Sequence, residues 1–330
     1  MLKKLLILTI SIVFLQSCKN GTGTLKNDNI DRRKREEIKV LNDKLFKAIE
    51  KGDLGTINIL LADTLKKTVN VNQFVSSFIT NIKLADYKIL DEYNVPNSEG
   101  KGECNFSSDN QGVNDYEVKF KPLNKEIYTS LILSKDENNE FLILVGYGKY
   151  GEEWKVNMLY SGQYRLFGKT VPEYYELAKE ADKMSNLVDA FNYSNVAYEL
   201  LKIKTEFFQF KNEKQIIQFF EKTSSDFAIK YPFPLKLDQV PSKPEIYAVT
   251  AQLSNGAISP KISYKSTISI ADEAALKQEN QSVRDEIGKI FTGVDQHKKY
   301  IFYMVSNEFP ETGKVGEQYG FVDTLKVPVN

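Results

Sequence analysis

The stretch AIEKGDL, residues Ala48–Leu54, ends one helix and turns the chain into the next. Gly52 tolerates the left-handed backbone conformation that commonly ends a helix, and Asp53 suits the turn that follows. Upstream, apolar residues recur every three or four positions over residues 31–51, which predicts a helix with one buried face. The residues on that face are Ile38, Leu41, Leu45, Ala48 and Ile49.

Two further helices and a run of strands are predicted after this turn. The first helix is short and turns Ile57, Leu60 and Leu61 inward, and the second begins after Asn72. The apolar residues of the second helix are Phe74, Phe78, Ile79 and Ile82. From Asp86 onward apolar and polar residues alternate, which is typical of strands. The predicted strands start at residue 87 and continue at 117–121, 127–133, 140–147 and 153–160.

Three helices followed by a curved antiparallel sheet, with the Gly-Asp turn of AIEKGDL, resemble the NTF2-like cone fold over residues 31–160. The resemblance rests on apolar positions and on that turn. It implies a concave pocket but no particular chemistry, because members of this superfamily include enzymes, ligand binders and association modules. The polar aromatic residues expected to line the pocket are Tyr116, Tyr128, Tyr147 and Trp154. Ordinary sheet packing of these four side chains is the alternative.

A helical bridge is predicted over residues 169–230. Thr170, Pro172 and Glu173 have the order of a capped helix start, with a capping box and a proline in the first turn. The expected buried faces are Tyr174, Leu177, Ala178, Ala181 and Met184, then Ala190, Tyr193, Ala197, Leu200 and Leu201, then Ile216, Ile217, Phe219 and Phe220. A single tetratricopeptide-like hairpin is the alternative, although no second copy follows it.

The sequence of the C-terminal third predicts a small α+β unit. A proline-rich connector at residues 231–244 precedes strands at 246–253 and 261–270, which Asn255-Gly256 joins. A helix is expected at 271–291, with Ala275, Val283, Ile287 and Ile290 buried, and strands follow at 300–305 and 320–327. The prediction is therefore an α+β protein with an NTF2-like domain at 31–168, a helical bridge at 169–230 and a second small α+β domain at 231–330.

The N-terminal stretch MLKKLLILTISIVFLQSC has the form of an export signal. Lys3 and Lys4 precede an apolar run of residues 5–15, which is shorter than the roughly 20 residues that span a bilayer. The ending Leu15-Gln16-Ser17-Cys18 resembles the lipobox of bacterial lipoproteins. That resemblance implies a signal peptide at residues 1–17 and a lipid on Cys18. A secretory signal with an incidental cysteine, or a buried N-terminal helix, is the alternative.

Several consequences follow from the lipobox resemblance. Residues 18–30 would carry the lipid and form a flexible tether, because they are polar and rich in Gly, Asn and Thr. The protein would be anchored to a membrane of a bacterial cell envelope, with the outer membrane favoured over the inner one. Cys104 would then have no second cysteine to pair with, and a small apolar residue in a strand is the expected role for it.

Composition argues against several kinds of chemistry. The 44 basic and 44 acidic residues balance, so no basic footprint predicts binding to nucleic acid. His297, in a polar turn, is the one histidine of the sequence, which excludes the HExxH metal motif, and no phosphate-binding glycine loop occurs. No catalytic residue, cofactor or metal is therefore predicted, although paired carboxylates remain open because their pairing is spatial.

The leading hypothesis is a lipid-anchored envelope protein without enzymatic activity, which binds a partner protein or a small envelope ligand. One alternative is a hydrolase or isomerase that uses carboxylates and tyrosines in the cone pocket, and a perturbed carboxylate deep in a cleft would favour it. The other alternative is a structural assembly subunit, which would expose an apolar patch instead of a pocket.

Overall fold

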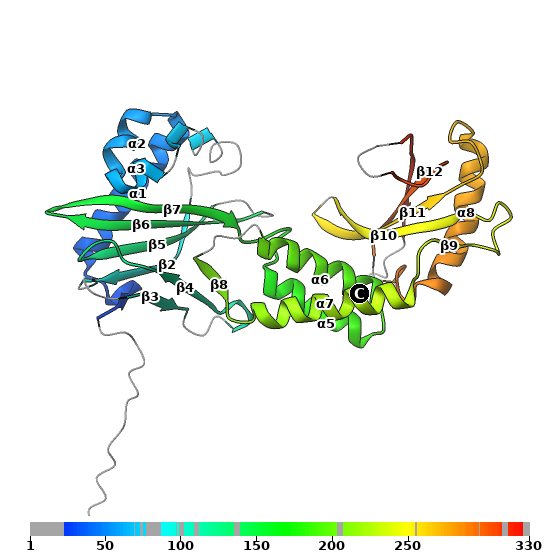
Figure 1. The fold of residues 1–330 in the computed structure, drawn as a ribbon, viewed down its shortest axis with the longest axis horizontal. Helices are drawn as coiled ribbons and strands as arrows, with labels where there is room; N and C mark the ends of the chain where they lie inside the picture. The colour runs from blue at the N-terminus through cyan, green and yellow to red at the C-terminus, as the bar shows by residue number, and fades with distance from the viewer. Residues whose placement is uncertain are drawn as a thin grey trace, which may run out of the picture.

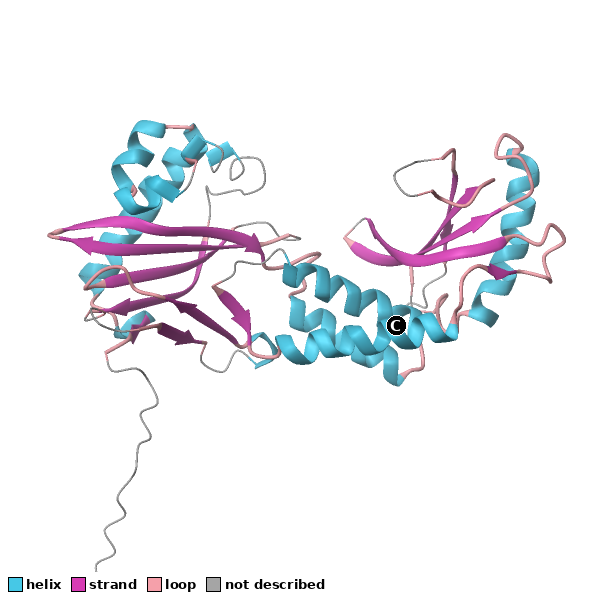
Figure 2. Cartoon of the chain, viewed as in Figure 1, coloured by secondary structure: helices cyan, strands magenta, loops and turns pink. Residues whose placement is uncertain are grey.

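The structure is a computed structural model, which describes residues 23–68, 70–72, 75–76, 87–96, 98, 102–108, 112–134, 139–202, 207–254, 256–296, 298–311 and 316–325. The chain is a mixed α+β protein, as predicted, and these residues form seven α-helices and three sheets. Figure 1 shows three parts along the longest axis: helices on a sheet, a bundle of helices, and a second sheet with one helix. Figure 2 shows the same division by secondary structure.

Helix α1, Arg32–Lys51, begins and ends where the sequence predicts. The Asp31 carboxylate accepts hydrogen bonds from the backbone N–H groups of Arg33 and Lys34 at 3.0 and 3.2 Å, which caps the first turn. Gly52 ends the helix with φ of +64°, in the left-handed region. All the predicted apolar positions face inward, four of them fully buried and Leu41 partly so.

Helices α2, Leu54–Leu60, and α3, Asp63–Thr68, follow in quick succession. The Asp53 side chain accepts from the backbone N–H of Thr56 at 3.0 Å and caps α2. The inward positions of α2 are as predicted, whereas α3 was not predicted because six residues show too little periodicity. The apolar residues of the helix predicted after Asn72 lie outside the described residues.

The N-terminal sheet has five antiparallel strands in the order β1-β2-β5-β6-β7. The strands are β1 Leu25–Lys26, β2 Lys88–Val95, β5 Ile127–Leu133, β6 Phe141–Tyr150 and β7 Glu153–Gln163. A second, three-stranded sheet consists of β3 Cys104–Ser107, β4 Tyr116–Phe120 and β8 Phe208–Phe210. Helices α1–α3 lie on one face of the larger sheet and the smaller sheet lies on the other (Figure 1). Every residue of β5 is buried, because both of its faces are covered.

The predicted tether at residues 18–30 is too long, because its last residues belong to the fold. Leu25 and Lys26 pair with β2 as strand β1, and a 3-10 turn, Asn27–Asn29, follows. Ile30 is buried against the N-terminal helices. Backbone pairing fixes this short strand, and two residues are too few for a strand pattern to show in the sequence. Residues 18–22 lie outside the described part of the chain.

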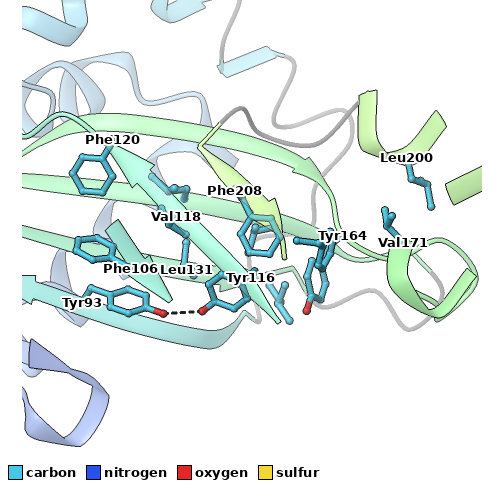
Figure 3. Close-up of a cluster of buried hydrophobic side chains, with 14 of the residues drawn as sticks. Tyr93, Phe106, Tyr116, Val118, Phe120, Leu131, Tyr164, Val171, Leu200 and Phe208 are labelled. Carbon is cyan, nitrogen blue, oxygen red and sulfur yellow. Dashed lines mark hydrogen bonds between the residues drawn. The ribbon is translucent and has the colours of Figure 1, made fainter. Parts of the chain in front are cut away.

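A middle core joins the two N-terminal sheets to the helices that follow them. Figure 3 shows its aromatic side chains, among them Tyr93, Phe106, Tyr116, Phe120 and Phe208, packed between the two sheets. Tyr93 and Phe106 stack with ring centroids 4.5 Å apart, and Tyr116 and Phe208 stack at 4.6 Å. Cys104 is buried in the same core on β3, as the sequence predicts.

Three helices form the central bundle: α5 Val171–Lys183, α6 Leu187–Lys202 and α7 Glu213–Lys230. The predicted capping box of Thr170 and Glu173 is confirmed at the start of α5. One predicted burial is wrong, because Met184 follows the end of α5 and is 65% exposed. On α7 only Ile216 of the four predicted positions is fully buried. Both α6 and α7 contribute side chains to the middle core at one end and to a C-terminal core at the other.

The C-terminal sheet has the strand order β13-β12-β11-β10-β9. Its strands are β9 Leu235–Lys236, β10 Glu245–Ser254, β11 Ala257–Lys265, β12 Tyr300–Ser306 and β13 Tyr319–Thr324. Strands β11 and β12 are parallel, and helix α8, Glu273–Ile290, connects them. Ser254 pairs with Ala257, so β10 and β11 form an antiparallel hairpin, and Asn255 of the predicted turn lies outside the described residues. The strand predicted at 261–270 was misplaced, because β11 starts at the turn and ends at Lys265.

Candidate functional site

A pocket of about 380 Å³ lies where the helical bundle meets the C-terminal sheet. We call it the junction pocket. Four segments far apart in the sequence form its wall: the turn before α5, helices α5 and α6, the β10–β11 turn with the start of β11, and the loop before β12. Its lining residues are Phe167, Lys169, Tyr174, Leu177, Tyr193, Gly256, Ala257, Ile258, Ser259, Lys298 and Lys299. The volume lies within the range of about 300–1,000 Å³ that is usual for small-molecule sites.

The polar part of the pocket is built on Lys298, whose side chain is only 8% exposed. Its Nζ lies 2.8 Å from Asp189 Oδ2, and it donates to the Tyr193 hydroxyl, also at 2.8 Å. The same Nζ lies 4.8 Å from the centroid of the Tyr193 ring, within reach of a cation–π interaction. A buried lysine is tolerated here because a carboxylate and a hydroxyl replace the water that it lost.

Asn186 holds Asp189 in place at the start of α6. Its Nδ2 donates to Asp189 Oδ2 at 2.7 Å and to the Gly293 carbonyl at 3.0 Å, while its Oδ1 accepts from the Asp189 backbone N–H at 3.1 Å. Gly293 has φ of +81° and lies in the loop after α8, so one amide side chain joins the bundle to the C-terminal unit. The position of the carboxylate, and through it that of Lys298, is therefore fixed from two elements.

The electrostatics keep Lys298 charged at neutral pH. Burial acts to lower the pKa of Lys298, but the Asp189 carboxylate and the Tyr193 hydroxyl outweigh it and hold that pKa above its ordinary value. Burial raises the pKa of Asp189, and the charge of Lys298 and the Asn186 hydrogen bond oppose that rise. The pocket wall therefore contains a fixed ammonium group.

Two hydrogen-bond donors of this cluster have no acceptor among the described residues. The Lys298 ammonium group has three N–H bonds, and within the part of the chain that the structure describes its hydrogen bonds go to Asp189 and Tyr193 only. The Tyr193 hydroxyl accepts from Lys298, and its own proton has no protein acceptor within the described chain. Donors left open beside a cavity are suited to a ligand that supplies acceptors.

The rest of the wall is largely apolar. Tyr174 and Tyr193 stack with ring centroids 6.4 Å apart and an interplanar angle of 25°. The Tyr174 hydroxyl donates to the Leu166 carbonyl at 2.8 Å, so Tyr174 presents its ring to the pocket without a free polar group. Leu177 and Ile258 add aliphatic surface from the helix and from the strand. A ligand with an apolar body and one polar end would match this wall.

Three other hollows have a different charge. One, between α1, α2 and the β6–β7 hairpin, has a lining that contains Glu37, Glu152 and Glu153 against two lysines. The hollow beside β8 and α7 balances three carboxylates with three lysines. The hollow on the C-terminal sheet is lined by the acidic residues Glu308, Glu311 and Glu317. The lining of the junction pocket, as the structure describes it, has three lysines and no acidic side chain.

The four aromatic residues predicted to line a cone pocket do not form one. Tyr128 and Tyr147 are 0% and 1% exposed and fill the space between the sheet and helices α1–α3. The Tyr147 hydroxyl donates to Asn42 of α1 at 2.8 Å, so its polar group holds the helix on the sheet. Trp154 lies at the edge of the same core and lines the hollow by α1 and α2. For the two tyrosines, ordinary sheet packing is the observed arrangement.

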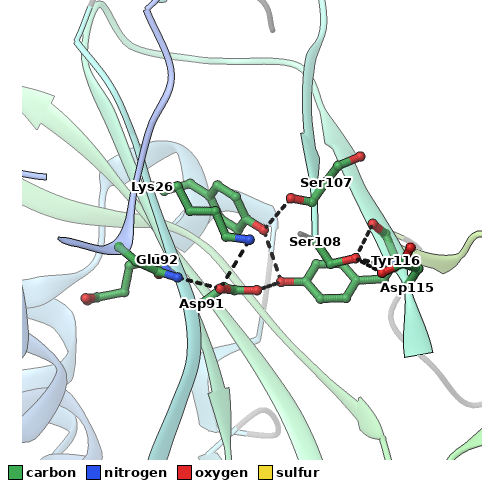
Figure 4. Close-up of polar contacts among 9 residues, drawn as sticks. Lys26, Asp91, Glu92, Ser107, Ser108, Asp115 and Tyr116 are labelled. Atoms are coloured by element: carbon green, nitrogen blue, oxygen red, sulfur yellow. Dashed lines mark hydrogen bonds and ion pairs between the residues drawn. The ribbon is translucent and has the colours of Figure 1, made fainter. Parts of the chain in front are cut away.

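Tyr116 lies on the other face of the sheet, in a closed polar cluster (Figure 4). Its hydroxyl donates to the buried Asp91 carboxylate and lies 3.0 Å from the Tyr93 hydroxyl, which in turn donates to the Ser107 carbonyl at 3.2 Å. Asn27 donates to the other carboxylate oxygen of Asp91 at 2.7 Å. This cluster holds the short strand β1 and the smaller sheet against β2.

Sequence reasoning missed the junction cluster altogether. Lys298 follows His297 in a stretch of sequence that predicts only a polar turn. In the sequence, Asp189 and Tyr193 occupy ordinary positions of a predicted helix. The contact between Lys298 and Tyr193 spans 105 positions, so no local spacing indicates it. Cys18 and His297 lie outside the described residues.

Comparison of the chain with models of protein families, with curated proteins and with solved structures gives no match. Among the described residues, no helix has the length and apolar character needed to cross a membrane. The same residues contain no group of three histidine, cysteine or acidic side chains placed to hold a metal ion.

Proposed function

We propose that this chain is a lipid-anchored envelope protein that binds a small ligand in the junction pocket and carries out no reaction on it. The observation that carries the proposal is the pair of open donors, on Lys298 and Tyr193, beside a cavity with an apolar wall. Such a combination of a mostly apolar hollow and a few fixed polar groups is the usual form of a small-molecule site.

The membrane part of the proposal rests on the first 18 residues. Their basic start, apolar run and lipobox-like ending support cleavage before Cys18 and lipidation of that cysteine, with the outer membrane favoured. Several acyl chains would hold the protein firmly, because each buried CH₂ contributes about 0.8 kcal/mol. A short polar segment then leads to β1 at Leu25, the first strand that the structure describes.

The domain assignment belongs to the same proposal. Helices α1–α3 on a five-stranded sheet support an NTF2-like domain at residues 31–168. The separate C-terminal core with its own sheet supports a second small α+β domain at 231–330. Helices α6 and α7, which contribute to two cores each, would form the bridge at 169–230.

The enzymatic alternative is less well supported by the geometry. It needs a perturbed carboxylate facing an open cone interior, and Glu92 is the buried carboxylate beside Tyr128. Burial raises the pKa of Glu92, while the Tyr128 hydroxyl and the charge of Arg35 oppose that rise. Glu92 lines none of the four hollows described above, and Tyr128 and Tyr147 occupy the interior beside it.

A second candidate function is binding of an envelope protein through α1 and α2. Val40 and Ile59 are 65% and 63% exposed, and both line the hollow that Trp154 borders. Two exposed apolar side chains beside a hollow are a common feature of contact surfaces. Crosslinking in native membranes from positions 40 and 59 would test this candidate, and crosslinks no different from those of an exposed control at Glu50 would argue against it.

Two measurements test the leading proposal. The first is the intact mass of the protein purified from native membranes, beside a Cys18→Ala variant. We expect cleavage before Cys18 with added acyl chains, and loss of both in the variant. An unlipidated protein that is released from the membrane would contradict the anchor.

The second measurement is binding of fluorescent naphthalene probes. Ala257 is an exposed residue in the wall, and Ala257→Trp should fill the pocket without disturbing a core. Thr250→Trp, on the exposed surface of the neighbouring strand β10, is the matched control. We expect one probe to bind per chain, and Ala257→Trp but not Thr250→Trp to abolish the binding. Binding that survives Ala257→Trp, or no binding to the wild type, would overturn the pocket.

A further inference from the structure

The charge of the junction pocket restricts what it can hold. Lys298 is fixed in the wall, and Lys169 and Lys299 are exposed at the rim, with no ion-pair partner for either among the described residues. Asp189 neutralises one of these charges from behind Lys298, which leaves a net positive wall. The three other hollows described above are balanced or acidic, so among these four the excess of lysine is particular to the junction pocket.

The hydrogen-bonding groups point to the same kind of ligand. Lys298 donates to Asp189 and to the Tyr193 hydroxyl oxygen, which leaves one N–H of Lys298 and the Tyr193 hydroxyl proton without an acceptor among the described residues. A cation would meet an ammonium group here, and a neutral hydrocarbon would leave both donors without partners. A carboxylate, sulfonate or phosphate oxygen satisfies both donors and gains the charge as well.

The remaining wall determines the other end of the ligand. The Tyr174 ring, Leu177 and Ile258 give apolar contact, and the rings of Tyr174 and Tyr193 form a stacked pair. A volume of about 380 Å³ has room for a body of one or two rings or a short chain, since it lies near the small end of ligand sites. A bare inorganic anion would leave this surface in contact with water.

We infer that the junction pocket takes a small amphiphilic anion, in which one acidic group sits on Lys298 and Tyr193 and an apolar or aromatic body lies along Tyr174, Leu177 and Ile258. The inference rests on the pocket proposed above. Its competing explanation is that Lys298 serves only to join the bundle to the C-terminal sheet, in which case the pocket would not discriminate by charge.

A matched pair of probes separates these explanations. The probes are 8-anilinonaphthalene-1-sulfonate, which is an anion, and N-phenyl-1-naphthylamine, which has the same rings without the sulfonate. We expect the folded protein to bind the anionic probe at least tenfold more tightly, because a hydrogen bond to a charged group contributes about one order of magnitude or more in affinity. The preference should shrink as ionic strength rises, since the rim lysines are exposed to screening.

Two variants locate the discrimination within the pocket. Tyr193→Phe removes one donor and keeps the ring, and we expect it to weaken the anionic probe about tenfold and the neutral probe less than twofold. Lys299→Gln removes a charge at the rim and should weaken the anionic probe by a smaller factor. Lys214→Gln is the matched control, because Lys214 is also exposed but lines the charge-balanced hollow by α7.

Each outcome decides between the proposals. Equal affinity for the two probes, with both blocked by Ala257→Trp, would keep the pocket and overturn the anionic ligand. An anionic preference that neither Tyr193→Phe nor Lys299→Gln reduces would also overturn this inference. Loss of the block by Ala257→Trp would instead overturn the pocket itself. A tenfold preference that falls in Tyr193→Phe and persists in Lys214→Gln supports the inference.

Discussion

Two buried carboxylate clusters of this protein differ in whether their hydrogen bonds are complete. Asp91, 3% exposed, accepts from Tyr116 and Asn27, and the chain of hydroxyls ends on a backbone carbonyl. Asp189, 7% exposed, is paired with Lys298, but that lysine and Tyr193 keep donors beside a cavity for which the described residues supply no acceptor. The comparison shows that burial and charge alone do not mark a site. We propose that the open donors next to the junction pocket mark a binding site, whereas the completed donors of the Asp91 cluster hold a structural joint.

The largest effect is expected at the open cluster. Asp189→Leu leaves the Lys298 ammonium group buried without its counter-charge, and we expect the free energy of unfolding to fall by about 3–5 kcal/mol. The double variant Asp189→Leu with Lys298→Met removes both charges and should recover most of that loss. Urea unfolding of the single and double variants measures the difference. If the double variant is as unstable as the single one, the attraction within the Asp189–Lys298 ion pair exceeds the free-energy cost of burying its two charges.

A smaller effect is expected at the closed cluster. Asp91→Ala removes the acceptor of Tyr116 and Asn27, and leaving such donors without partners costs about 2–3 kcal/mol. Because the Lys26 Nζ also lies 3.4 Å from Asp91, strand β1 should loosen first. Hydrogen exchange should therefore rise at residues 25–30 before it rises in β5. Unchanged exchange at these residues would mean that backbone pairing alone holds β1.

The next prediction separates a structural tyrosine from a binding one. Tyr147→Phe leaves the side-chain amide oxygen Oδ1 of Asn42 buried without its donor, and we expect a loss of about 1–2 kcal/mol in stability. The affinity for the anionic naphthalene probe should not change, in contrast to Tyr193→Phe. Thermal unfolding and probe titration of the two variants give both quantities. A fall in probe affinity in Tyr147→Phe would return the cone interior to consideration as a binding site.

The smallest effect concerns pH and the buried carboxyl of Glu92. Its pKa is raised in the folded protein, chiefly by burial, so the stability that its neutral form contributes is present below the unfolded pKa of about 4.3. That stability is lost as the pH rises through the folded pKa. We therefore expect Glu92→Gln to match the wild type near pH 4 and to be more stable than the wild type at pH 7, by less than about 1 kcal/mol.

Melting temperatures of both proteins at the two pH values measure this difference. Glu50→Gln, on the exposed face of α1, is the matched control and should show no such dependence on pH. An advantage of Glu92→Gln that is equal at pH 4 and pH 7 would contradict the electrostatic explanation.

The elements that the sequence predicted well carry their signals locally. The start and end of α1, the capping box of α5 and the antiparallel pairing of β10 with β11 depend on residues close to one another in the sequence. The short strands β1 and β8 were missed because two or three residues show no periodicity, and only pairing with a distant strand defines them. The ends of strands were misjudged for the same reason, as in β11.

The candidate pocket residues were chosen from the sequence by residue type, and residue type does not indicate how deeply a side chain is buried. A tyrosine has a polar hydroxyl on an apolar ring, so Tyr147 and Tyr193 look alike in the sequence. In the structure Tyr147 donates to a buried amide, whereas Tyr193 keeps its own proton beside the cavity. The two hydroxyls differ because Asn42 of α1 contacts Tyr147, whereas Lys298 of the loop before β12 contacts Tyr193.

The sequence by itself determined the α+β class, the long helices and most of the strands, because periodicity, capping and turn chemistry act within one element. It also supplies the lipobox-like ending at Cys18, on which the membrane proposal rests. Only the tertiary structure decided where a ligand could bind. The junction pocket needs α5, α6, the β10–β11 turn and the loop before β12 in one place, and side-chain packing between distant elements brings them together.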